Sequence, residues 1–213
     1  MRESNFWDEF EYSKLKLLLN IDKVNSIMDV ANGKRMLDKS FPISVELHLT
    51  DLCNLKCSWC TDKELRKNKA TLSLETIRKI FKEFAERNTG ITLEGGGEPT
   101  LHPNFKEIVD AGSELGLDLG LITNGTIDIS DSVHRLKWIR VSLDSSNENE
   151  YKSEKGVDAF DKVLENLKKM TAIRNPQKTF VGVGYVLTKR NQNNLEDLIN
   201  QLDKIGVDYI YIR

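Results

Sequence analysis

Three cysteines lie within eight residues of one another in a polar segment. Cys53, Cys57 and Cys60 are the only cysteines of the 213-residue chain. An odd, tightly spaced set is a poor framework for disulfides and is typical of a metal site. Three thiolates can each bind one iron of a [4Fe–4S] cubane, which leaves the fourth iron without a protein thiolate. That iron can take an external ligand, as open catalytic metal sites do.

Other metal chemistry fits this spacing less well. A structural zinc ion needs four ligands, so His48 or His102 would have to complete the set. A cluster that only carries electrons normally has four cysteines. A non-catalytic iron–sulfur or regulatory module is the alternative to a catalytic centre.

The elements that must position the cysteines alternate between strands and helices. The predicted strands cover residues 43–49, 91–94, 117–123, 138–143, 180–187 and 207–212. The predicted helices between them cover residues 73–88, 104–115, 130–136, 159–173 and 195–205. Repeated βα units predict a parallel sheet with right-handed crossovers. The cysteines follow the first strand directly, where parallel barrels carry their catalytic loops.

The strands alternate between apolar and polar residues, and this pattern favours one closure of the sheet. Continuous apolar strands would indicate a doubly wound sheet, because helices then cover both faces. One apolar and one polar face instead predict an α/β fold with a hollow, partial (βα)6 TIM-like barrel. An edge-exposed sheet with a solvated face is the alternative. The polar side chains expected inside the barrel are those of Glu46, His48, Glu94 and Arg140.

Residues 1–40 lack this alternation and predict a helical cap. Apolar residues recur at helical spacing before position 20, and a short helix at 22–31 ends at Asn32-Gly33. We therefore divide the chain into a cap at 1–40 and a barrel core at 41–213. The last strand ends near Arg213 with no helix after it, which predicts further domain beyond this residue.

The bulk composition argues against several classes of partner. Apolar residues make up 39% and charged residues 30% of the chain, as in ordinary globular proteins. The net charge of −2 gives no electrostatic footprint for nucleic acid or an anionic membrane. No apolar run is long enough to span a bilayer, and the N-terminus lacks a signal-peptide pattern. We therefore expect a cytoplasmic protein.

Four motifs, taken together, resemble the radical SAM superfamily. The Cys-x3-Cys-x2-Cys pattern carries Trp59 before its third cysteine, and a Gly-Gly-Glu-Pro run at 96–99 follows the second strand. Asn-Gly at 124–125 closes the third strand, and Ser-Leu-Asp at 142–144 ends the fourth. The resemblance covers about residues 42–213. It is strongest to the branch that contains SPASM-type peptide maturases and enzymes of molybdenum-cofactor and pyrroloquinoline-quinone synthesis.

This resemblance implies that a [4Fe–4S] cluster on the three cysteines reductively cleaves S-adenosylmethionine (SAM). The residues that it implies for SAM binding are Trp59, Gly96, Gly97, Glu98, Asn124, Ser142 and Asp144, with Val183 or Val186 against the adenine. A 5′-deoxyadenosyl radical would then abstract hydrogen from a substrate inside the barrel. The candidate catalytic residues there are Glu46, His48, Glu94, Arg140 and Asp144. A flavodoxin, a ferredoxin or a chemical reductant would supply the electrons.

The resemblance leaves two substrate classes open. A peptide or protein side chain is the favoured substrate, and oxidation or epimerisation of a small molecule is the alternative. That molecule would be a sugar, an aminocyclitol or a cofactor precursor. Many members of the branch carry a C-terminal extension with further cysteines, whereas this sequence has three in all. Either the extension is missing or the protein works with one cluster.

Overall fold

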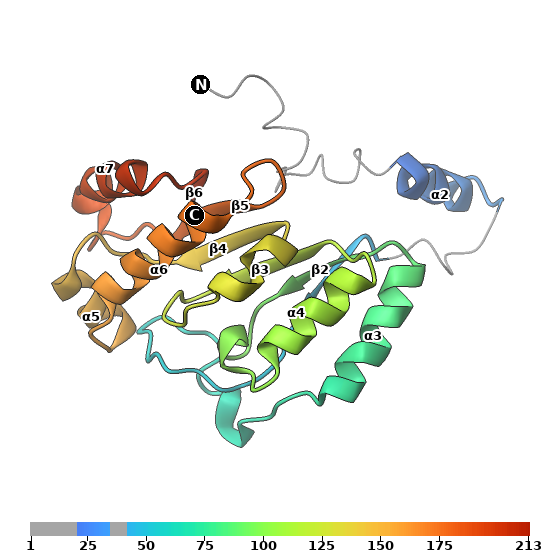
Figure 1. Cartoon of the computed structure of the whole chain (residues 1–213), viewed down its shortest axis with the longest axis horizontal. Coiled ribbons are helices and arrows are strands. Elements are labelled where there is room, and N and C mark those ends of the chain that lie inside the picture. Colours follow the sequence, from blue (N-terminus) through green and yellow to red (C-terminus); the bar gives the residue numbers. More distant parts are fainter. Residues whose placement is uncertain (1–20, 35–41) are drawn as a thin grey trace.

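A computed structural model describes residues 21–34 and 42–213. Its centre is a parallel sheet in which six strands follow one another in sequence order. The strands are β1 (Ser44–Leu47), β2 (Gly90–Leu93), β3 (Leu119–Thr123), β4 (Trp138–Ser142), β5 (Phe180–Tyr185) and β6 (Tyr209–Ile212). Figure 1 shows α3, α4 and α6 lying across one face of this sheet. The predicted partial (βα)6 barrel is therefore confirmed.

Helices connect the strands at the predicted places. The helices of the barrel are α3 (Leu74–Glu86), α4 (Phe105–Glu114), α5 (Glu148–Lys155), α6 (Phe160–Ile173) and α7 (Leu195–Ile205). Short 3-10 helices are η2 (Arg66–Asn68), η3 (Pro99–Leu101), η4 (Ser130–Arg135) and η5 (Gln192–Asn194). Every predicted boundary falls within two residues of the observed one. The sequence pattern did not predict helix α5.

The two faces of the sheet differ as the alternation predicts. On the helix-covered face, residues such as Val141 and Val183 are fully buried in the apolar core. Successive side chains of a strand point to opposite faces, so the interior face of β5 carries Gly182 and Gly184. Of the two residues predicted against the adenine, Val183 is therefore disfavoured, because it lies in the core beneath the helices. Val186 lies on the interior side of this alternation and is half-buried.

The interior face carries the four polar residues expected there. Glu46 and His48 are exposed, and Glu94 and Arg140 are half-buried. None of them belongs to the apolar core beneath the helices. Glu94 and Arg140 instead border an interior cavity of about 60 Å³. The barrel is thus polar inside, as its sequence pattern requires.

Glycines make room for large aromatic side chains near the amino-terminal ends of the strands. A Cβ atom on Gly120 would lie 2.1 Å from the ring of Trp138, its neighbour on β4. A Cβ atom on Gly182 would lie 2.3 Å from the ring of Tyr209 on β6. Both separations are too short for any side chain. The two rings therefore lie directly on the backbone of the neighbouring strand and fill this end of the interior.

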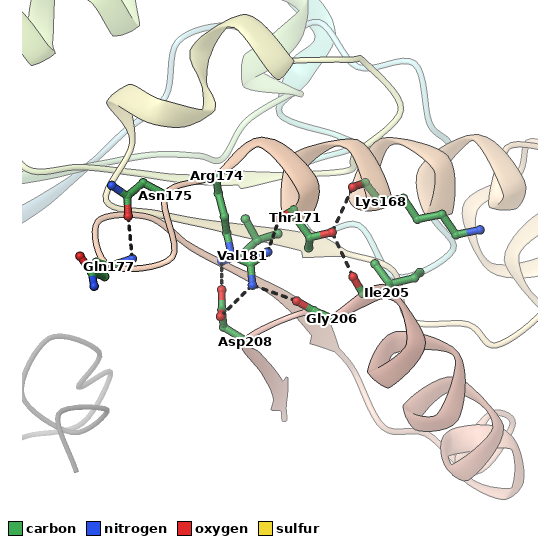
Figure 2. Close-up of polar contacts among 9 residues, drawn as sticks. All are labelled: Lys168, Thr171, Arg174, Asn175, Gln177, Val181, Ile205, Gly206 and Asp208. Carbon is green, nitrogen blue, oxygen red and sulfur yellow. Dashed lines mark hydrogen bonds and ion pairs between the residues drawn. The ribbon is translucent and has the colours of Figure 1, made fainter. Parts of the chain in front are cut away.

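A polar network fixes the start of β6 at the same end (Figure 2). Arg174, which follows α6, donates hydrogen bonds to the carbonyls of Thr171 at 2.6 Å and Gly206 at 2.9 Å. Its guanidinium also pairs with Asp208 at 3.0 Å. The second oxygen of Asp208 accepts a hydrogen bond from the backbone N–H of Val181 at 2.8 Å. The network therefore joins α6, β5 and the segment between α7 and β6.

The described part of the predicted cap is one helix and its turn. Helix α2 (Ile21–Ala31) ends in a turn at residues 32–34, as predicted. The buried ammonium of Lys23 donates hydrogen bonds to the carbonyls of Arg87 at 2.8 Å and Pro42 at 3.3 Å. Burial, and then the charge of Arg87, lowers the pKa of Lys23. The helix predicted before position 20 lies outside the described residues, and the division into cap and core stays a proposal.

No helix within the described ranges is long and apolar enough to cross a bilayer.

Candidate functional site

The cysteine loop leaves the carboxyl-terminal end of β1. Cys53, Cys57 and Cys60 are free, partly buried thiols. Burial raises the pKa of the Cys57 thiol, the Lys155 ammonium opposes this change, and the other two cysteines add to it. A guanidinium N–H of Arg66 donates to the Cys60 sulfur at 3.3 Å. The three thiols are therefore near enough to influence one another's charge, as ligands of one cluster must be.

The base of the loop pairs with the segment that leads into α3. The N–H of Leu72 donates to the carbonyl of Leu49 at 3.0 Å, and that of Asp51 donates to the carbonyl of Ala70 at 2.7 Å. The N–H of Ala70 donates in return to the Asp51 carboxylate at 3.1 Å. This short antiparallel pairing closes the loop at its base and fixes where the first cysteine lies.

The glycine run after β2 lies against the start of the cysteine loop. Gly95 and Gly96 have φ values of +70° and +58°, in the region that favours glycine. The N–H of Gly97 donates to the carbonyl of Thr50 at 2.8 Å. A Cβ atom on Gly97 would lie 2.0 Å from the carbonyl oxygen of Leu52. Only glycine fits here, because the two backbones are in direct contact.

The Glu98 carboxylate is buried and joins the ends of two strands. One oxygen accepts hydrogen bonds from Thr100 Oγ1 at 2.7 Å, Thr123 Oγ1 at 2.6 Å and the N–H of Thr100 at 3.1 Å. The other accepts from the N–H of Asn124 at 2.7 Å. Burial raises the pKa of Glu98, although these hydrogen bonds lower it. These hydrogen bonds tie Glu98, the residue after the glycine run, to the end of β3, and its predicted contact with SAM stays a prediction.

Asn124 fixes the middle of the cysteine loop to the end of β3. Its side chain donates to Asn54 Oδ1 at 2.8 Å and accepts from Thr126 Oγ1 at 2.7 Å and the N–H of Thr126 at 2.9 Å. Asn54 donates to Thr126 Oγ1 at 2.8 Å, which completes a ring of hydrogen bonds. Sequence reasoning missed Asn54 and Thr126. The asparagine directly after the first cysteine was the signal in the sequence that could have indicated Asn54.

Helix α5 holds the part of the loop around the second and third cysteines. The carbonyls of Glu154 and Lys155 accept hydrogen bonds from the N–H groups of Ser58 and Lys56, at 2.9 Å each. The Ser58 hydroxyl donates to the Glu154 carboxylate at 2.9 Å. The Lys155 ammonium lies 5.2 Å from the centroid of the Trp59 ring. The last turn of α5 thus satisfies its free carbonyls with the cysteine loop.

Asp144 forms a buried ion pair with Lys155 at the end of β4. Their side chains are 4% and 3% exposed, and the second Asp144 oxygen accepts from the N–H of Val186 at 2.7 Å. Asp144 has a φ of 59°, which is unusual for a residue other than glycine. Its carboxylate is thereby occupied by protein partners. Ser142, the other predicted contact of this motif, borders the interior cavity.

The two histidines of the zinc alternative are placed differently. The ring of buried His102 contacts the carbonyl of Leu72 at 2.8 Å, and its Nδ1 accepts from the N–H of Asn104 at 3.1 Å. The His48 ring lies over Gly95, where a Cβ atom would be 2.0 Å from Nε2. Within residues 21–34 and 42–213, no three Cys, His, Asp or Glu side chains converge on one ion. A cubane needs no such convergence, because each thiolate binds a different iron.

The hydroxyl of Tyr151 bears on whether a cluster fits beside the cysteine loop. This side chain of α5 is fully buried, and its hydroxyl has no hydrogen-bond partner in the part of the chain described. Burial, followed by the charges of Cys57 and Asp144, raises the pKa of Tyr151. A thiolate or sulfide acceptor at the loop would satisfy this hydroxyl. The residues present therefore fit a [4Fe–4S] cluster.

Comparisons with known proteins agree with this geometry. The family model of the radical SAM superfamily matches residues 47–211. A probable GTP 3',8-cyclase of Sulfurisphaera tokodaii is 32% identical over 190 residues, which cover 83% of this chain and 58% of the relative. The same-named protein of Saccharolobus islandicus is 30% identical over 177 residues, with coverages of 79% and 55%. The chain thus spans little more than half the length of these relatives.

Solved structures share the fold at low identity. Streptococcus suis SuiB bound to S-adenosylmethionine has a TM-score of 0.70 and 19% identity, covering 89% of this chain and 44% of SuiB. SuiB bound to its precursor peptide SuiA has a TM-score of 0.69 and 16% identity, with coverages of 93% and 54%. The family match extends over most of the chain, cysteine loop included. The chain therefore belongs to the radical SAM superfamily, whose enzymes use a [4Fe–4S] cluster and S-adenosylmethionine.

Proposed function

We propose that this chain is the SAM-cleaving core of a radical SAM enzyme that acts on a small polar molecule. The observation that carries the proposal is the direct contact between the glycine run and the cysteine loop, at Gly97 and Leu52. When bound, the cluster supplies the electron that splits SAM into methionine and a 5′-deoxyadenosyl radical, which takes hydrogen from the substrate. A flavodoxin or ferredoxin would reduce the cluster.

The residues around this contact have separate tasks. Cys53, Cys57 and Cys60 would hold the cluster, and three thiolates would leave its fourth iron without a protein ligand. The backbone carbonyls of the run accept hydrogen bonds from the amino group of SAM. Trp59 and Ser142 contact the rest of the cofactor from the loop and from the end of β4. Hydrogen bonds from other strands preset this arrangement, so that little reordering accompanies binding.

The substrate class follows from the curated relatives and from the interior. The relatives at 30% identity or more carry a name for a reaction of GTP, a small molecule. SuiB in complex with its precursor peptide is only 16% identical to this chain, and so low an identity supports a shared fold alone. The cavity beside Ser142 is small and bordered by charged groups. These observations favour the small-molecule alternative over the peptide substrate that the sequence motifs favour.

Anaerobic reconstitution tests the proposed reaction. The protein is loaded with iron and sulfide, reduced with dithionite and incubated with SAM, and 5′-deoxyadenosine is measured by mass spectrometry. We expect its formation in the wild type and a loss of at least about 100-fold in Cys57→Ala, because the cubane loses one of three thiolates. Lys56→Ala, an exposed neighbour in the same loop, is the matched control and should retain activity. Persistence of the product in Cys57→Ala would refute the cluster assignment.

A further inference from the structure

The barrel interior holds a charged cluster that the cofactor roles leave unused. Glu94, just after β2, lies beside the carboxyl of Glu46 on β1. Arg140 of β4 and Arg213, just after β6, are close enough to lower the pKa of Glu94. The Arg140 guanidinium lies 4.8 Å from the centroid of the Tyr211 ring. Four strands thus bring two acidic and two basic side chains together.

Glu94, Arg140 and Arg213 border one cavity of about 60 Å³, which they share with Ser142. Glu46 lies beside Glu94. A water molecule in the liquid occupies about 30 Å³, so the cavity has room for a phosphate-sized or carboxylate-sized group. A Cβ atom on Gly184 would lie 3.4 Å from Arg140 Cδ, so this glycine leaves space for the arginine. Because Ser142 is a predicted SAM contact, a molecule anchored here lies beside the cofactor.

The protonation state of Glu94 decides whether the four charged side chains carry a net positive charge. Burial and the contact with Glu46 raise the pKa of Glu94 to about 7, and the two arginines oppose this change. Two adjoining carboxylates resist ionising together, so the pair carries one negative charge below that pH. Two guanidinium groups then leave the cluster net positive.

Few other charges face this pair. Asp144 borders the cavity, but its charge is balanced by Lys155. His48 lies against Gly95 and is not among the residues that border the cavity. Tyr211 is the remaining titratable side chain that borders the cavity. The pH dependence near neutrality is therefore expected to come from Glu94.

We propose that the Glu46–Glu94 pair, with Arg140 and Arg213, binds an anionic group of the substrate, either a phosphate or a carboxylate. The guanidinium fork matches the oxygens of both groups. The protonated glutamate pair removes one opposing charge and offers a hydrogen-bond donor. The proposal rests on the proposed function only in identifying the ligand as the substrate, because anion binding is measurable without cluster or SAM.

Calorimetric titration of the purified chain with sulfate and with acetate tests this site. Both probes keep their charge between pH 6 and 8 and stand for phosphate and carboxylate. Wild-type affinity should fall by about tenfold from pH 6 to 8, because deprotonation of Glu94 adds a negative charge. Glu94→Gln should bind with the same affinity at both pH values. Tighter binding of sulfate than of acetate identifies a phosphate site, and the reverse identifies a carboxylate site.

The arginine is tested in the same titration. Arg140→Gln should weaken binding at pH 6 by at least about tenfold, which corresponds to 1.4 kcal/mol. Arg78→Gln and Glu107→Gln, exposed on the outer helices, are the matched controls. Binding that is absent from the wild type, unchanged in Arg140→Gln or still pH-dependent in Glu94→Gln would overturn the proposal. If no 5′-deoxyadenosine forms while the chain still binds the anion, the result contradicts the proposed function and leaves the anion site standing.

Discussion

Nearly buried charged groups lie at both ends of the barrel, but they hold different parts of the chain in place. At the carboxyl-terminal end, Glu98 and the Asp144–Lys155 pair fix loops that carry the predicted ligands. At the amino-terminal end, Arg174 and Asp208 bind backbone groups where helices and strands meet. The first set positions the loops of the predicted active site, and the second holds the strands in their order. This division agrees with parallel barrels in general, whose loops after strands carry the active site.

Residues with positive φ lie at both ends of the strands, and Asn88 before β2 is one of them. Gly95, Gly96 and Asp144 all have positive φ values, and all follow the carboxyl-terminal ends of strands. At Asp144 this conformation is sterically costly, and the ion pair with Lys155 offsets the cost. At the carboxyl-terminal end, one residue, Asp144, combines a positive φ with a buried charge. Substitutions there should affect both stability and cofactor binding.

Breaking the Asp144–Lys155 pair should have the largest effect. Lys155→Met leaves a buried, unpaired carboxylate, so we expect the free energy of unfolding to fall by about 3–5 kcal/mol. The double variant with Asp144→Asn should lose less, because no buried charge remains. Denaturant unfolding of the protein without cluster measures both. Lys152→Met on the same helix, whose pair with Asp158 is exposed at 3.6 Å, is the control and should change stability little. A Lys155→Met variant as stable as this control would show that Asp144 is hydrated rather than buried.

Breaking the network at the opposite end should have a smaller and purely structural effect. Arg174→Met removes hydrogen bonds to two carbonyls and an ion pair whose side chains are 10% and 8% exposed. We expect a loss of about 1–3 kcal/mol in the free energy of unfolding. Iron bound per folded chain after reconstitution should equal that of the wild type. A reduced iron content in folded Arg174→Met would remove the distinction between the two ends.

The sheet could be predicted well because the side chains of a strand point alternately to its two faces, and this produces an alternation of polar and apolar residues in the sequence. The alternation of polar and apolar residues placed Glu94 and Arg140 inside the barrel, where the structure has them. On β5 the sequence left Val183 and Val186 as alternatives, because alternation alone does not say which face is the interior one. Because Gly182 must lie under Tyr209, the glycines of this strand mark its interior face.

The roles of the polar residues could not be predicted in the same way. Family motifs place Glu98 and Asp144 beside the cofactor, but their hydrogen bonds come from other strands and helices. Thr123 and Lys155 reach them from 25 and 11 positions away. Helix α5 was missed because its eight residues are mostly charged and show no apolar stripe. It forms between a capping Asn147 and Gly156, and it buries Tyr151 against the core.

The central claim is that three thiolates leave one iron open beside the glycine run. Electron paramagnetic resonance of the reduced, reconstituted protein, recorded before and after addition of SAM, tests it most directly. Because SAM would bind the open iron, we predict about four irons per chain and a spectrum that changes when SAM is added. A cluster spectrum that is identical with and without saturating SAM would contradict the claim.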